Sequence, residues 1–180
     1  MRIQTTIAAM TVWMCFSAAA TSVQAQQPQI PTLQVCNMTK VQGKAVVKIQ
    51  SRQDAFHAGA FRVAIEVRCD PTGLPYPAGA VEISIDMSDS TVQGLVTSID
   101  IEQLTSTGKH SPTAYLSGRC KAERAPGCRF WLTLADNKPA GQGETPDVVG
   151  FLIFDGNGTR VAYGTGPVVE GDITVAPTPY

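Results

Sequence analysis

The sequence has few charged residues, and neither sign of charge prevails. Asp, Glu, Lys and Arg make up 16% of the 180 residues, with 15 acidic and 14 basic side chains and a formal net charge of −1. Proteins that bind nucleic acid or anionic membrane surfaces through charge carry a clear excess of basic residues. The composition therefore excludes a nucleic-acid groove and a polybasic membrane surface.

The residue patterns of common catalytic sites are also missing. The sequence holds two histidines, His57 and His110, both in turn-like surroundings, and no Gly-x-Ser-x-Gly motif that would present a nucleophilic serine. It has no Cys-x-x-Cys pair, which a zinc or redox site would require. We therefore expect a protein that is not an enzyme. A small secreted hydrolase that uses His57 or His110 with nearby acids is the first alternative.

The N-terminus has the features of a secretory signal peptide over residues 1–25. Arg2 supplies a positive start, residues 7–20 are largely apolar, and the triplet Val-Gln-Ala at 23–25 fits a cleavage site after Ala25. The apolar stretch is too short for a retained membrane span, which needs about 20 apolar residues, and no later run is longer. We expect a product without a membrane span, in a bacterial periplasm or outside the cell.

The cysteines predict two disulfide bonds. Of five cysteines, Cys15 lies in the signal peptide, and an even count of four in an exported chain is typical of disulfide pairing. Cys120 and Cys128 flank a polar loop with a Pro-Gly pair, as the two bases of a hairpin would. This leaves Cys36 to pair with Cys69.

Alternation with a period of two dominates the rest of the chain. In residues 61–69 apolar side chains occupy every other position and charged ones fill most of the gaps, which is typical of a half-buried antiparallel strand. No segment keeps a helical period beyond two turns. We expect an all-β fold, an antiparallel sandwich or open barrel of about nine strands, as one domain over residues 34–175 with a loose arm at 26–33 and a disordered tail at 176–180. The expected strands are residues 42–51, 61–69, 81–87, 92–103, 113–120, 128–135, 148–155, 159–164 and 168–175.

Three stretches of the C-terminal half are similar to a known module. Residues 118–137, residues 146–151 and the Gly-Asp-Ile-Thr-Val segment at 171–175 resemble the C-terminal hairpin of the post-COAP domain, a β-rich module of secreted bacterial proteins. In that family a strand ending in Asp-Asn precedes an Asp-started strand and a final Gly-x-Ile-x-Val strand. The resemblance covers about residues 79–175, although the Cys120–Cys128 bridge departs from the pattern. It implies a β-rich fold and secretion, and it transfers no catalytic residue.

The aromatic pattern around Trp131 indicates a candidate binding surface. On strand 128–135 alternate residues form a core face, so that Trp131 points away from the core. The next strand is apolar on both faces and would bring residues 151–153 near Trp131 if the two strands pair. We expect an outward patch of Trp131, Phe151 and Ile153 that contacts a glycan, a protein or a second copy of the chain. The alternative is that a loop or the N-terminal arm covers the patch as a second small core.

The segment Asp155-Gly156-Asn157-Gly158 begins like a calcium loop. Asp155 and Asn157 place oxygen ligands on alternate residues, but Gly166 stands where the bidentate Glu of an EF-hand would lie. The same residues are also a strong hairpin signal. A structural Ca²⁺ is therefore the one candidate cofactor, and a Ca²⁺-dependent adhesion module is the second alternative. The preferred function is an exported, non-catalytic binding or structural module of the cell envelope or the extracellular space.

Overall fold

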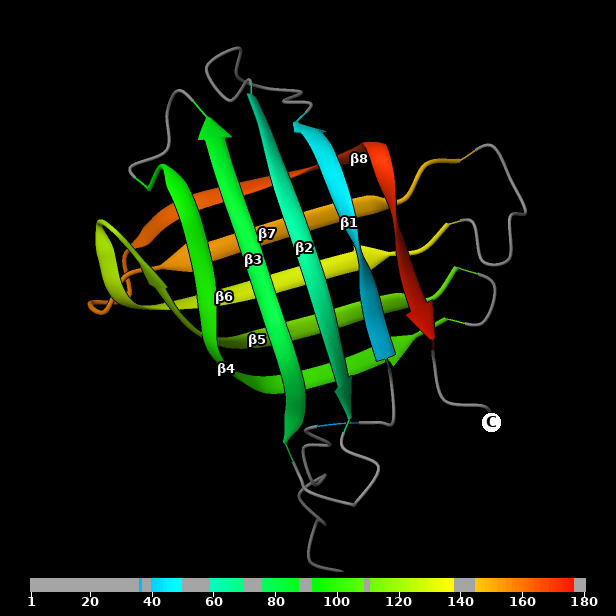
Figure 1. Ribbon diagram of the computed structural model, residues 1–180, viewed down its shortest axis with the longest axis horizontal. Helices are drawn as coiled ribbons and strands as arrows, with labels where there is room; N and C mark the ends of the chain where they lie inside the picture. The colour runs from blue at the N-terminus through cyan, green and yellow to red at the C-terminus, as the bar shows by residue number, and fades with distance from the viewer. Residues whose placement is uncertain are drawn as a thin grey trace, which may run out of the picture. The chain divides into compact units, whose positions relative to one another are not determined.

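The chain forms an antiparallel barrel in a computed structural model that describes residues 36, 40–49, 59–69, 76–87, 92–108, 111–137 and 145–176. Each strand pairs with the next along the chain, and the last pairs with the first, so that the barrel is closed (Figure 1). The strands of the described ranges are β1 (Lys40–Ile49), β2 (Gly59–Cys69), β3 (Pro77–Met87), β4 (Gly94–Thr107), β5 (Thr113–Ala122), β6 (Ala125–Ala135), β7 (Val148–Phe154) and β8 (Arg160–Ala176).

The expected all-β, antiparallel class is confirmed, but the architecture and the strand number differ from the expectation. The barrel is closed and has eight strands in the part of the chain that the structure describes, because the expected strands 159–164 and 168–175 are a single strand, β8. The glycines at 164 and 166 allow β8 to cross β1 closely, since a Cβ at Gly166 would overlap the carbonyl oxygen of Lys48.

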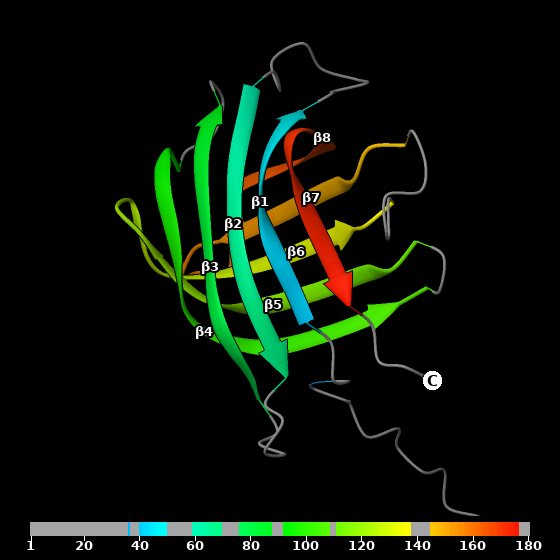
Figure 2. The ribbon, with the colours of Figure 1, turned by 45° about the vertical axis from the view of Figure 1, so that its right-hand side comes forward.

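Two strands close the barrel by changing neighbours. Residues 160–167 of β8 pair with β7, and its residues 168–176 pair with β1. Likewise, β4 pairs with β3 only over residues 94–97 and with β5 over residues 96–107. The strands β1–β3 therefore form one layer and β5–β7 the other, and the two layers cross at a steep angle (Figures 1 and 2).

Apolar side chains from both layers fill the barrel. The inward positions follow the predicted period of two, and Phe61 of β2 meets Phe151 of β7 edge-on across the interior, with ring centroids 4.7 Å apart. Small barrels of this strand number are just wide enough for side chains to fill. The hollows considered below lie on the outside of the described strands.

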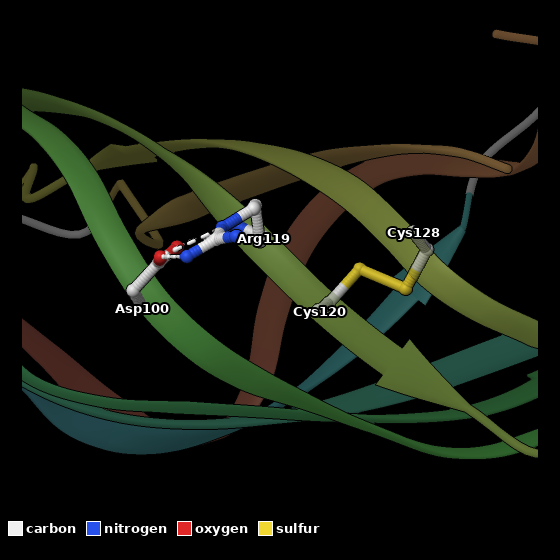
Figure 3. Close-up of a disulfide and its surroundings, with 4 residues drawn as sticks. All are labelled: Asp100, Arg119, Cys120 and Cys128. Carbon is white, nitrogen blue, oxygen red and sulfur yellow. Dashed lines mark hydrogen bonds and ion pairs between the residues drawn. A yellow bond between two sulfur atoms is a disulfide. The ribbon is translucent and has the colours of Figure 1, made fainter. Parts of the chain in front are cut away.

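Both predicted disulfides are present. Cys36–Cys69 joins the end of β2 to the segment before β1, and Cys36 also makes an isolated parallel bridge to Leu104 of β4. Cys120 and Cys128 are directly opposite each other on β5 and β6, with Cα atoms 4.9 Å apart (Figure 3). Disulfides of this kind are consistent with an oxidising compartment. No helix in the described ranges has the length and apolarity of a membrane span.

Two buried aspartates bind the main chain of β8 after it leaves β7. The carboxylate of Asp147 accepts hydrogen bonds from the amides of Asn137, at 2.9 Å, and Ile173, at 3.2 Å. The carboxylate of Asp136 accepts one from the amide of Val175, at 3.1 Å. A buried amide without an acceptor is costly, so these carboxylates stabilise the part of β8 that β7 no longer reaches.

Candidate functional site

The outer surface of β5, β6, β7 and the first half of β8 presents a row of mostly apolar side chains, which includes two aromatic rings. Ser117, Trp131, Leu152 and Tyr163 are successive cross-strand partners, so they lie side by side on one face. Trp131 is 41% exposed and Leu152 is 38% exposed. Trp131 thus points outward, as the alternation predicted. We call this surface the outer β5–β8 face.

The other two members of the expected patch lie inside the barrel. Phe151 is 3% exposed and Ile153 is fully buried, so their predicted outward placement is wrong. Trp131 pairs with Leu152, and with a period of two this register turns Phe151 and Ile153 inward. The outer neighbours of Trp131 on β7 are Leu152 and Phe154. The rings of Trp131 and Phe154 are T-shaped, with centroids 5.0 Å apart.

A row of arginines runs beside the aromatic row. Arg119, Arg129, Phe154 and Arg160 are cross-strand partners in turn, and the three arginines are exposed. Like charges on adjacent strands repel each other unless they are compensated. The guanidinium of Arg160 lies over the ring of Tyr163, 4.3 Å from its centroid, which is a cation–π distance.

The other two arginines are compensated by acids on β4. Arg119 donates from its Nε to Asp100 Oδ2 at 2.7 Å, and its main-chain amide donates to Asp100 Oδ1 at 3.1 Å (Figure 3). Arg129 pairs with Glu102. β4 has register shifts at 98–100 and 101–103, so that Glu102 sits in a bulge, a feature that re-aims a side chain.

The ion pair fixes the charge states of both partners. The hydrogen bond from the Arg119 side chain holds the pKa of Asp100 below its usual value, and the same bond raises the pKa of Arg119. Both side chains are substantially exposed, so the pair positions charges on the surface and adds little stability.

Two neighbouring hollows share these two arginines in their linings. The first, of about 490 Å³, is lined by Trp131, Phe154, Arg119, Arg129 and the turn at 155–158. The second, of about 740 Å³, is also lined by Arg119 and Arg129 and extends to Tyr76, at the start of β3. We call the combined depression the outer groove. Its defining residues are Tyr76, Asp100, Glu102, Arg119, Arg129, Trp131 and Phe154.

The divergence of β3 from β4 creates the second hollow. The two strands pair only where Glu82–Ile85 faces Gly94–Thr97, and the amide of Val81 then donates to Ser98 Oγ at 2.9 Å. Beyond that point the first residues of β3 separate from β4. Tyr76 stands at this end of the groove and is 62% exposed.

Asp155 and Asn157 form a hairpin turn between β7 and β8. Asp155 Oδ1 accepts from the amides of Asn157, at 2.9 Å, and Thr159, at 2.8 Å, and Gly158 adopts a positive φ of 81°. Through these hydrogen bonds the Asp155 carboxylate stabilises the hairpin turn that the sequence predicted. In the described part of the chain no group of three or more His, Cys, Asp or Glu residues could hold a metal ion.

Several predicted features lie outside the described residues. These are the signal peptide at 1–25, the arm at 26–33, His57, His110 and residues 177–180 of the expected tail. Residue 176, which was also expected in the disordered tail, is instead the last residue of β8. The groove itself was missed by sequence reasoning, because Tyr76 precedes β3, Glu102 lies on β4 and Arg129 lies on β6. Only the pairing of β4 with β5 and of β5 with β6 brings the last two together.

Comparisons of the chain with protein-family models, with curated proteins and with solved structures found no match. The fold and the site therefore describe the protein as a disulfide-bridged, closed antiparallel barrel. Aromatic residues and arginines line the outer groove on its surface.

Proposed function

We propose that this protein is an exported, non-catalytic binding module of the cell envelope or the extracellular space, and that it binds its partner in the outer groove. The observation that carries the proposal is that two hollows share Arg119 and Arg129 in their linings and that each is also lined by an exposed aromatic residue, Trp131 in one and Tyr76 in the other. Tryptophan, tyrosine and arginine are the residue types that contribute most to binding in protein interfaces.

The geometry favours binding because the groove residues stand on strands that hold them in place. Trp131 and Arg129 lie on β6, in the part of the strand that pairs with both β5 and β7. Side chains on a rigid sheet lose less freedom on binding than side chains on a mobile loop.

The charge states in the groove support a non-catalytic role. General acid–base catalysis is most efficient when a group titrates near the working pH. Asp100 instead has a lowered pKa and is engaged by Arg119, so it is a poor proton carrier at neutral pH. The acids and arginines of the groove are better suited to orient a ligand than to react with it.

Export is supported by the two disulfides, by the predicted signal peptide and by the resemblance to the post-COAP domain. The resemblance itself stays part of the proposal.

The proposal can be tested by retention of envelope material on immobilised protein. Glycan and protein fractions of bacterial envelopes are passed over the wild type and over the Trp131→Ala and Tyr115→Ala variants. Tyr115 is also an exposed aromatic residue of β5 but does not line the groove, so it is the matched control. We expect Trp131→Ala to retain about tenfold less material and Tyr115→Ala to match the wild type. No retention by the wild type, or equal retention by all three proteins, would contradict the proposal.

A further inference from the structure

We infer that the ligand of the outer groove is a neutral oligosaccharide, with one sugar ring stacked on Trp131 and another, further along the chain, on Tyr76. This inference rests on the proposed function and adds the chemical class of the ligand. It follows from three properties of the groove: its aromatic ends, its polar middle and its charge balance.

The aromatic ends suit the faces of pyranose rings. A sugar ring presents a patch of C–H groups, which packs on the electron-rich face of an indole or phenol ring. Trp131 is exposed in the first hollow, and the T-shaped contact with Phe154 restricts its rotation. Tyr76 is the exposed ring at the other end.

The polar middle suits hydroxyl groups. Each sugar hydroxyl can donate one hydrogen bond and accept others, so it is best bound where donors and acceptors lie together. The pairs Arg119–Asp100 and Arg129–Glu102 offer this combination, because each guanidinium has more N–H groups than its ion pair uses.

The charge balance disfavours an anionic ligand. Two basic residues, Arg119 and Arg129, line the two hollows together with three acidic ones, Asp100, Glu102 and Asp155. A polyanion such as a uronic acid chain or a phosphate polymer would gain little from paired arginines and would be repelled by the acids.

The extent of the groove calls for a chain of several sugars. Each hollow lies within the range of about 300–1,000 Å³ that is usual for small-ligand sites. Because Trp131 and Tyr76 line different hollows, a ligand that reaches both aromatic rings must be longer than a single sugar unit.

The test is calorimetric titration of the full oxidised chain with defined hexamers. The probes are β-1,4-linked hexamers of glucose, N-acetylglucosamine, mannose and xylose, together with hexagalacturonate and an extended alanine-rich peptide. We expect at least one neutral hexamer to bind. Trp131→Ala should weaken that binding about tenfold or more, and Tyr115→Ala should leave it unchanged.

Tyr76→Ala provides a second variant that should preserve the fold, because its side chain is exposed just before β3. It should weaken binding of the hexamer and leave binding of the corresponding disaccharide at the Trp131 end unchanged.

Binding of none of the neutral hexamers would overturn the inference, as would binding that neither Trp131→Ala nor Tyr76→Ala weakens. Binding of hexagalacturonate alone or of the peptide alone would also overturn it. If the protein fraction of the envelope is retained in a Trp131-dependent way while no neutral hexamer binds, the proposed function stands and the oligosaccharide inference fails.

Discussion

The two outer faces of the barrel are built from strands of the same type, yet they differ in what they expose. The face formed by β1, β2, β3 and the second half of β8, which we call the outer β1–β3 face, carries charges of both signs and also exposes Val169. Lys44 of β1, for example, stands opposite Asp172 of β8. The exposed charged residues of this face are Lys40, Lys44, Lys48, Arg62 and Arg68 against Glu66, Glu82, Asp86, Glu170 and Asp172, five of each sign.

The outer β5–β8 face instead exposes Trp131 and Leu152 and places its arginines in one row. On the outer β1–β3 face the opposite charges of Lys44 and Asp172 form a favourable cross-strand pair, and this face is built without an exposed tryptophan. An exposed tryptophan is therefore not a requirement of this barrel. The difference between the faces supports a binding role for one of them.

The largest effect that we expect is the loss of stability when a disulfide is removed, because each layer of the barrel carries its own bridge. Replacing Cys36 and Cys69 together by alanine frees a loop of 33 residues, and replacing Cys120 and Cys128 frees one of 8. Loop-closure entropy predicts losses of about 4 and about 2.5 kcal/mol in the free energy of unfolding. Urea denaturation of both double variants checks this order. A larger loss for the shorter loop would show that packing of the buried Cys120–Cys128 pair outweighs chain entropy.

The next effect concerns β8, the strand that belongs to both faces. Asp147→Ala removes the acceptor for the amides of Asn137 and Ile173, so we expect a loss of about 3 kcal/mol in stability. Asp147→Asn keeps a carbonyl oxygen and should lose less. Chemical denaturation measures both variants. Equal stability of Asp147→Ala and the wild type would refute the role of this carboxylate in holding β8.

A smaller effect is a difference in ligand binding between variants of the two faces. Trp131→Ala should reduce retention of envelope glycans about tenfold, whereas truncation of an exposed apolar residue on the other face should not. Leu95→Ala is the matched variant, since Leu95 lines a hollow of the outer β1–β3 face and is exposed. Equal losses of glycan retention in the two variants would mean that the difference between the two faces does not determine binding.

The smallest effect is a pH dependence. Asp100 has a folded-state pKa below its ordinary value of 3.8, mainly because Arg119 donates to it. Its contribution is present above that ordinary value and is lost as the pH falls through the folded-state pKa, because the unfolded chain binds the proton first. Urea midpoints measured at acid pH should fall less steeply in Arg119→Gln than in the wild type. An unchanged slope would contradict the assigned ion pair.

Local patterns were sufficient for the all-β class, the cysteine pairing and the outward direction of Trp131. Each depends on alternation or spacing within a few residues. Local patterns did not predict the inward direction of Phe151 and Ile153. A strand that is apolar on both faces fits either orientation, and a shift of one residue in the register exchanges its inward and outward side chains. The continuity of β8 through Gly164 and Gly166 depends on a close approach to β1, which lies more than a hundred residues earlier in the chain.

The groove could not be predicted from local sequence patterns either. Arg119 and Arg129 read as ordinary exposed residues of two strands, and their partners Asp100 and Glu102 lie on a third. Bulges on β4 set the register that brings these four side chains together. No local pattern encodes that register.

The most direct test of the central claim is iodide quenching of Trp131 fluorescence in the full oxidised chain with Trp13→Phe, which leaves Trp131 as the only tryptophan. The account predicts red-shifted emission that iodide quenches at every protein concentration, and protection from iodide when a neutral hexasaccharide that binds is added. Blue-shifted emission that iodide cannot reach in the free protein would contradict it, because the groove would then be covered by the protein itself.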